Sequence, residues 1–201
     1  MEMRCAELDP KSRYKLLIGL VYPRPIALVS TINANGVLNA APFSFFNVVA
    51  DEPPLVMLSI NRRSDGTMKD TVKNIRRTGE FVVNLVDEAI ANGMVSAGQE
   101  LPETESEFSA GRFTPAASVA VAPPRVLEAP ASLECRLQQR VEVGTGREII
   151  LGEVLHVHVR DGLVDPATWR VSEGYRPIGR LYGDRYCTTR QRFDLPGPLP
   201  E

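Results

Sequence analysis

The chain has 201 residues, of which 43% are hydrophobic and 24% charged, so it can bury a sizeable core and is not disordered as a whole. Its formal net charge of −2, with both signs interspersed, favours neither nucleic acid nor an anionic membrane as a partner. The cysteines Cys5, Cys135 and Cys187 are odd in number and far apart. This number and spacing predict free thiols in a reducing compartment. They do not indicate a disulfide framework or a zinc site.

The N-terminal segment carries no apolar run of the length that a signal peptide needs. No window approaches the roughly 18 consecutive apolar residues of a membrane span. A soluble cytoplasmic protein is therefore expected. We predict a polar arm over residues 1–14, one domain over 15–190, and a Pro-rich tail over 191–201 that frays.

The domain opens with a helical turn predicted at residues 15–21, which two prolines around Arg24 bring to an end. Four short apolar runs follow, at residues 26–32, 37–41, 44–49 and 55–60. Asn35-Gly36 supplies the positive φ angles of a tight hairpin, and Pro42 is expected to interrupt the second run. Strands at this short, regular spacing predict an antiparallel barrel or sandwich and not a parallel sheet.

The apolar period changes to that of a helix at residues 67–78. Thr67 and Asp70 fit a capping box at its start, and Gly79 fits its C-terminal cap. A strand at residues 81–86 and a helix at 88–97 follow.

The second half of the domain begins with a long, partly helical connection at residues 99–124. A connection of this length in a compact domain is typically functional. Alternating residues then predict strands at 131–143 and 148–159, which form a hairpin around Gly144-Thr145-Gly146.

The first candidate binding feature is the entrance of the helix at 67–78. Free backbone N–H groups and a partial positive charge at a helix N-terminus favour a phosphate group. Charge-assisted hydrogen bonds could be added by Lys69, by Ser64, Thr67 and Thr71, and by Arg62 or Arg63. The local pattern alone is more typical of an ordinary capped surface helix with solvated charges.

A second candidate feature is a set of small hydroxyl and aromatic residues at strand ends: Ser30, Thr31, Ser44, Phe45, Phe46 and Asn47. Their hydroxyl and backbone groups could bind the edge of a heterocycle, and the phenylalanines could wall its face. Taken singly, each is more simply barrel packing.

The two histidines, His156 and His158, alternate on a predicted strand and so point to the same face. Two histidines without further ligands do not predict a metal site. His156 is instead a candidate cleft residue. The chain has no GxGxxG, Walker A or GxSxG motif, so the standard dinucleotide, nucleotide and hydrolase signals are absent.

Taken in order, these motifs resemble the flavin reductase-like family, which are FMN-binding split β-barrels that include the flavoredoxins. The matching segments are RPIALVST, NAAPFSFF, DEPPLVMLSI, KDTVKNI and TGEFVVN, and the resemblance covers roughly residues 12–190. It implies a mainly β fold with flanking helices, an antiparallel, Greek-key-like split barrel. It also implies a homodimer with one FMN per subunit, FMN being favoured over FAD.

The resemblance also implies roles for individual residues. Ser30 and Thr31 would lie at the pyrimidine side of the flavin ring. The ring and ribityl chain would contact Ser44, Phe45, Phe46, Asn47, Ser59, Ile60 and Asn61, and the phosphate would contact Ser64, Lys69, Thr71 and one of Arg62 and Arg63.

The activity implied is that of an NAD(P)H:flavin oxidoreductase, in which hydride passes from the nicotinamide C4 to flavin N5 and reduced flavin serves a monooxygenase or another acceptor. Because the flavin carries the electron chemistry, the protein needs no catalytic acid, base or nucleophile. One alternative is a flavoredoxin-like electron carrier that does not use NAD(P)H directly. Another is a non-redox binding module. Any residue that selects the electron donor is expected in 99–124 or 176–190.

Overall fold

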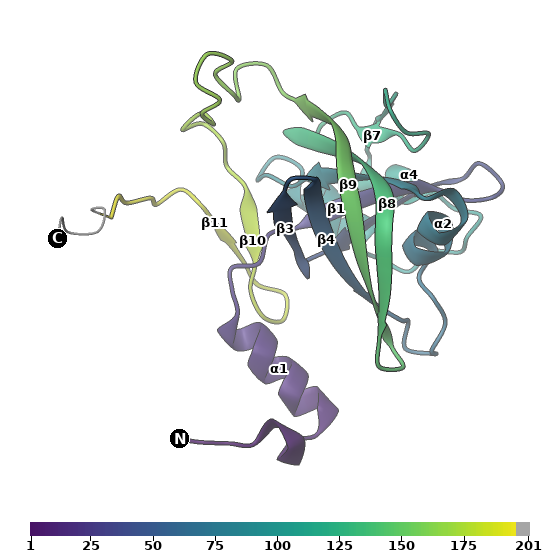
Figure 1. Ribbon diagram of the computed structural model, residues 1–201, viewed down its shortest axis with the longest axis vertical. Coiled ribbons are helices and arrows are strands. Elements are labelled where there is room, and N and C mark those ends of the chain that lie inside the picture. Colours follow the sequence, from purple (N-terminus) through teal and green to yellow (C-terminus); the bar gives the residue numbers. More distant parts are fainter. Residues whose placement is uncertain (196–201) are drawn as a thin grey trace.

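The computed structural model describes residues 1–195, and all pairings in its seven-stranded sheet are antiparallel. The strand order is β2-β1-β5-β8-β9-β4-β3. Figure 1 labels five strands of this sheet, β1, β8, β9, β4 and β3. The strands are β1 (Ala27–Ile32), β2 (Leu38–Phe43), β3 (Phe46–Asp51), β4 (Pro54–Asn61), β5 (Glu80–Leu85), β8 (Ala131–Val143) and β9 (Arg147–Val159). The predicted mainly β, antiparallel architecture is therefore confirmed.

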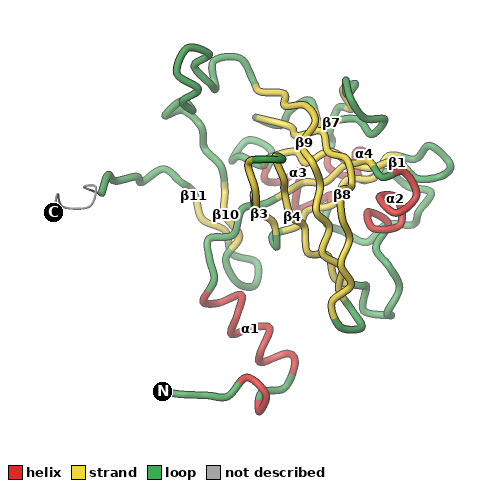
Figure 2. Tube along the Cα trace, viewed as in Figure 1, coloured by secondary structure: helices red, strands yellow, loops and turns green. Residues whose placement is uncertain are grey.

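The remaining elements surround this curved sheet (Figure 2). The helices are a 3-10 turn at Cys5–Glu7, α1 (Pro10–Leu20), α2 (Asp70–Thr78), α3 (Ala91–Ala97) and α4 (Glu107–Gly111). Two short ribbons are formed by β6 (Pro115–Ala116) with β7 (Arg125–Val126), and by β10 (Ile178–Arg180) with β11 (Tyr186–Thr188). None of the helices in residues 1–195 is long and apolar enough to span a membrane. The last residues of the predicted fraying tail, 196–201, lie outside the described part.

The N-terminal arm is more ordered than predicted. Helix α1 begins at Pro10, five residues before the predicted helical turn, and so spans the predicted boundary between arm and domain. Asp9 caps it, because its carboxylate accepts from the N–H groups of Lys11 and Ser12. Asp followed by Pro at the first helical position is a helix-start signal that was present in the sequence.

Pro42 does not interrupt its strand, which corrects the prediction. β2 continues through it to Phe43, with Pro42 opposite Leu28 of β1. β2 lies at one edge of the sheet. A proline is tolerated there because the N–H group that it lacks would have no partner strand.

The predicted capping box of α2 is also wrong. The N-cap residue is Lys69, whereas Thr67 bonds back to Asp65 through both its N–H and its hydroxyl group. Asp70 instead forms ion pairs with Arg63 and Lys73. The C-terminal prediction is confirmed: the helix ends at Gly79, whose left-handed φ of 72° suits a residue without Cβ. Helix α3 starts three residues later than the predicted 88.

Strand β1 is buried on both faces, and this divides the core in two. Ala27 and Val29 face one cluster, with Leu58, Phe81 and Ile150. The intervening Leu28 faces the other, with residues of α3 and α4. Alternate residues of a strand point to opposite faces, so an uninterrupted apolar run serves both clusters. Cys135 belongs to the first cluster, and burial raises the pKa of its thiol to about 12.

Candidate functional site

A hollow of about 480 Å³ opens where β4, α2 and the start of β9 meet the bend between β2 and β3 and the side of α1. Its volume is in the range of small-molecule sites. We call it the Lys69 hollow; it is lined by Tyr14, Pro42, Phe43, Ser44, Phe45, Ser59, Asn61, Lys69 and Arg147. Of the predicted site residues, Ser44, Phe45, Ser59, Asn61 and Lys69 are thus brought together.

Two cations stand at one end of the hollow. Arg147 donates from Nη1 to the carbonyl and hydroxyl oxygens of Ser59, at 3.1 and 3.2 Å. Its guanidinium carbon lies 4.6 Å from the centroid of the Phe45 ring, and burial lowers its pKa. Within residues 1–195, neither Arg147 nor Lys69 forms an ion pair with a carboxylate. This end therefore carries an uncompensated positive charge, which favours an anion.

Lys69 is placed there by helix α2. As the N-cap residue it has extended backbone angles, φ −66° and ψ 148°, and the helix proper starts after it. The N–H groups of the first helical turn, and the partial positive charge that they carry, add to the charge of the Lys69 side chain. The predicted helix entrance is therefore at the hollow, although its cap is not the one predicted.

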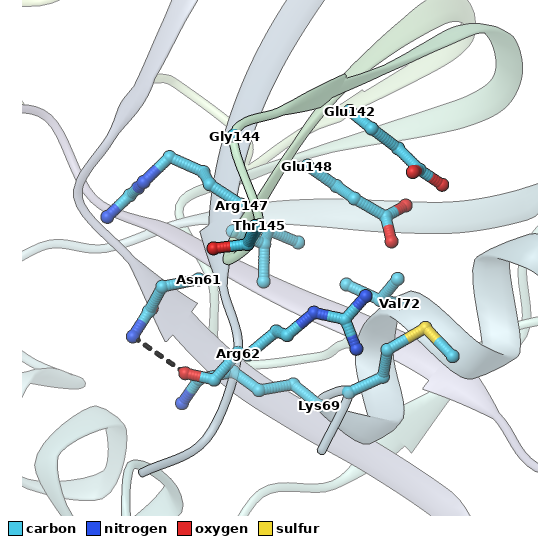
Figure 3. A pocket seen from close by; sticks show the side chains of 11 residues that line it. Asn61, Arg62, Lys69, Val72, Glu142, Gly144, Thr145, Arg147 and Glu148 are labelled. Atoms are coloured by element: carbon cyan, nitrogen blue, oxygen red, sulfur yellow. Dashed lines mark hydrogen bonds between the residues drawn. The ribbon is translucent and has the colours of Figure 1, made fainter. Parts of the chain in front are cut away.

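A smaller pocket continues from the same end and shares Asn61, Lys69 and Arg147 with the hollow (Figure 3). Glu142 and Glu148 border it, and in Figure 3 the Arg147 side chain points away from both. Glu148 pairs with Arg76 and with Arg140, and Glu142 pairs with the same two arginines. Both carboxylates are thus compensated by arginines that do not line the hollow.

The structure separates the two candidate phosphate arginines. Arg62 lines the smaller pocket, and its only side-chain hydrogen bond in the described chain runs to the carbonyl of Gly66 at 3.3 Å. Arg63 is turned away: it donates to the carbonyl of Met68 at 2.8 Å and pairs with Asp70. Arg62 is therefore the arginine that remains available near the hollow.

Other predicted residues are buried and already hydrogen-bonded. Ser30 and Thr31 are fully inaccessible. Ser30 donates to the carbonyl of Pro124 at 2.6 Å, and the Thr31 hydroxyl accepts from Asn39 and Asn74 at 3.1 and 3.0 Å.

Thr71 is buried as well, and its hydroxyl accepts from Asn39 at 3.2 Å. We call these residues, with Asn84, the interior polar set: Ser30, Thr31, Asn39, Thr71, Asn74 and Asn84. The structure does not bring Ser30, Thr31 or Thr71 to the hollow.

The remaining predicted residues are also elsewhere. Phe46 and Ile60 belong to the core cluster, and Ile60 also lines the smaller pocket. Asn47 is exposed, and its side-chain oxygen Oδ1 accepts from the N–H of Val48. Ser64 lies exposed in the turn before α2. His156 is exposed, about 30 Å along β9 from Arg147 at the usual rise per residue. Its ring contacts that of His158, which is hydrogen-bonded to the buried Glu134.

Sequence reasoning missed Arg147 and Tyr14. The sequence prediction leaves Arg147 between the turn at 144–146 and the strand at 148–159, whereas Arg147 starts β9 directly opposite Asn61 of β4. Only the non-local pairing of β4 with β9 brings it to the hollow. Tyr14 was assigned to a polar arm, but it lies on α1 and lines the hollow. The cap at Asp9 was the signal that could have found it.

The chain is similar to known proteins over most of its length. The model of the flavin reductase like domain matches residues 19–179. A protein of Aquifex aeolicus is 48% identical over 186 residues, which cover 92% of this chain and 94% of that protein.

Two solved structures are similar over almost their whole length. The 2-nitrobenzoate 2-nitroreductase of Pseudomonas fluorescens is 37% identical with a TM-score of 0.92, covering 100% of this chain and 99% of that one. The nitrilotriacetate monooxygenase component B of Bacillus cereus is 35% identical with a TM-score of 0.92, covering 97% and 98%. A split-barrel protein of Shewanella frigidimarina, 23% identical with a TM-score of 0.83 and covering 96% of each chain, shares the fold. The predicted split β-barrel is thereby confirmed.

Proposed function

The chain belongs to the flavin reductase-like family, and on this premise we propose that it binds FMN in the Lys69 hollow and acts as an NAD(P)H:flavin oxidoreductase. The observation that carries the proposal is the pair of uncompensated cations, Lys69 and Arg147, at one end of a hollow with aromatic and apolar walls. A phosphate group suits the charged end. A planar ring suits the walls.

The proposed orientation assigns each part of FMN to residues of this hollow. Lys69 and Arg147 bind the phosphate, with Arg62 near them. Ser59 and Asn61 bind the ribityl chain, and the bend at Ser44 and Phe45 carries the ring. We assign Ser30, Thr31 and Thr71 to holding together the strands and helix that carry these residues.

The smaller pocket supports FMN over FAD. Its volume of about 20 Å³ is close to that needed for one water molecule. It therefore has no room for the second phosphate and the adenosine that FAD adds to FMN. A single phosphate at Lys69 and Arg147 needs no such room.

Bound FMN would supply the hydride-accepting ring, and this chain's residues bind and orient it. In this proposal NADH or NADPH is the reductant. The acceptor is a small organic molecule or a partner monooxygenase, in line with the names of the nitroreductase and of the monooxygenase component.

We also propose that the protein is a homodimer. Helix α1 projects from the sheet (Figure 1). Leu17 and Leu20 in its last turn and Val21, its C-cap residue, are 52%, 70% and 63% exposed. Apolar side chains gathered on one projecting element favour burial against a partner, here a second copy. Light scattering after gel filtration measures the mass directly.

The proposed activity is tested by the visible spectrum of the purified protein with FMN, mixed anaerobically with NADH and, separately, with NADPH. Bleaching of the flavin absorbance within seconds is expected with at least one donor. FMN that binds but is not bleached would favour an electron carrier reduced by another protein. A protein that neither binds FMN nor oxidises NAD(P)H would contradict the proposal.

A further inference from the structure

A second hollow, of about 430 Å³, adjoins the Lys69 hollow and shares Tyr14, Pro42, Phe43 and Ser44 with it. We call it the Arg180 hollow. It lies between α1 and the β10–β11 hairpin. Its lining is about equally polar and apolar, and its charged residues are Arg24, Arg180 and Asp184.

The two arginines are held directly opposite each other. Arg24 and Arg180 form an isolated antiparallel bridge, in which each N–H donates to the other's carbonyl, at 3.0 and 2.8 Å. Residues opposite each other in such a bridge project to the same face, and like charges in that position destabilise the pairing. The backbones approach so closely that a Cβ at Gly179 would lie 2.5 Å from Cβ of Pro23. Only glycine fits there, so the register of the two arginines is fixed.

No carboxylate compensates Arg24. It is buried, and its guanidinium donates to the carbonyls of Ile18, Val21 and Leu181 at 2.7–2.8 Å. Within residues 1–195 it forms no ion pair. These neutral acceptors fix the charge in place without cancelling it. The Ser44 hydroxyl is a fourth acceptor, besides these three carbonyls. The Arg24 guanidinium therefore has few N–H groups left for a ligand.

Arg180 is better placed to contact a ligand. Its side chain is 29% exposed, and it donates to the hydroxyl of Tyr186 and the carbonyl of Gly183. Its one acidic neighbour in the described chain, Asp184, is 3.7 Å away and fully exposed, so solvent screens the pair. Arg24 and Arg180 thus place two positive charges side by side, and the buried one has no counter-ion. This arrangement lowers stability, and a bound anion would remove the cost.

We propose that the Arg180 hollow binds the second reactant, a planar conjugated molecule carrying a carboxylate, with Arg180 contacting the carboxylate and Arg24 providing a fixed positive charge behind it. This inference rests on the proposed function, in which the flavin occupies the adjoining Lys69 hollow. The apolar part of the lining, which includes Ile18, Ile26 and Met94, suits a ring. A guanidinium is the side chain best matched to a carboxylate. The pyrophosphate of a nicotinamide nucleotide is the other anion that would fit the charge.

The test measures binding of benzoate and of its neutral analogue benzamide by calorimetry, on FMN-loaded and on flavin-free full-length protein. Wild type is expected to bind benzoate about tenfold or more tightly than benzamide, because only benzoate pairs with the arginines. Arg180→Gln should abolish this preference and leave FMN and riboflavin affinities unchanged. The matched control is Arg185→Gln, in the same turn, where the guanidinium stacks on Tyr182 and does not line the hollow. It should keep the preference.

Several outcomes would overturn the proposal. Equal binding of benzoate and benzamide would do so, as would equal losses in the Arg180 and Arg185 variants. If Arg180→Gln weakens ADP-ribose and not benzoate, the pair serves a nucleotide pyrophosphate instead. If Arg180→Gln weakens the binding of riboflavin, the flavin ring itself occupies the Arg180 hollow. A wild-type protein that binds no FMN would contradict the proposed function, and benzoate titration of the flavin-free chain would still decide this inference.

Discussion

The interior polar set and the Lys69 hollow use polar side chains for opposite purposes. In the interior, the hydroxyls of Ser30 and Thr31 are bonded to other groups of the protein and are inaccessible. At the hollow, Lys69 and Arg147 have no carboxylate partner in the described chain. Buried polar groups must be satisfied within the protein, so the groups left for a ligand are those at the accessible end.

One helix carries residues of both the interior polar set and the Lys69 hollow. Thr71 and Lys69 are two residues apart at the start of α2, yet Thr71 points inward to Asn39 and Lys69 lines the hollow. Residues two apart on a helix do not share a face. The comparison predicts that substitutions in the interior lower the free energy of unfolding and leave FMN affinity unchanged. Substitutions at the hollow should weaken FMN binding and leave the free energy of unfolding nearly unchanged.

The largest effect is expected from Asn84→Ala. Asn84 is fully buried, donates to the carbonyl of Leu28 and to Ser30, and accepts from the N–H of Val126 and from Ser132. Its loss leaves several buried groups without partners, so the free energy of unfolding should fall by roughly 3 kcal/mol or more. Urea denaturation followed by circular dichroism measures it, and FMN affinity of the folded protein should not change.

The matched control for Asn84→Ala is Asn47→Ala. Asn47 is exposed on β3, and among the described residues its side chain bonds only to the adjacent N–H of Val48. Its removal should alter the free energy of unfolding by no more than about 0.5 kcal/mol. Similar losses of unfolding free energy in the two variants would show that the effect does not depend on burial of the amide.

Lys69→Ala is expected to weaken FMN binding by about 1.5–3 kcal/mol, the range for hydrogen bonds to charged groups. The binding of riboflavin, which lacks the phosphate, should be weakened much less, and the free energy of unfolding should be nearly unchanged. Fluorescence titration with both flavins measures this. Lys73→Ala is the control on the same helix, because Lys73 pairs with Asp70 and Glu103 and does not line the hollow. Equal losses for both flavins would mean that Lys69 acts through folding.

The sequence predicted the strands because their signals are local. Apolar runs and the turn that ends at Gly36 define the β1–β2 hairpin without further information. Of the predicted Asn35-Gly36 pair, only Gly36 has a positive φ, of 80°. The sequence could not predict that β4 pairs with β9 and places Asn61 opposite Arg147, since residues far apart in the chain make that contact. It also could not separate Thr31 from Ser59: both are hydroxyls near strand ends, and only burial distinguishes them.

Thr31→Val tests that distinction at the residue where the motif resemblance and the structure differ most. The substitution removes the acceptor for the amides of Asn39 and Asn74 while keeping the shape of the side chain. The free energy of unfolding should fall by about 1–2 kcal/mol, with no change in FMN affinity. Thr188→Val, at an exposed position of β11, is the control. Weaker FMN binding at unchanged stability would instead place Thr31 against the flavin.

The smallest expected effect is a difference between the two flavins in their dependence on pH. The second ionisation of a phosphate monoester has a pKa of about 6, whereas the hollow is lined by no His, Asp or Glu of the described residues, and both histidines lie elsewhere. Lowering the pH from 8 to 5 therefore protonates the ligand, whose remaining single negative charge interacts less strongly with the cations of the hollow, Lys69 and Arg147. FMN affinity should fall by about 1 kcal/mol or less, as expected for partly exposed ion pairs, and riboflavin affinity should stay constant. If both flavins weaken in parallel, the titrating group belongs to the protein, and the phosphate does not lie between these two cations.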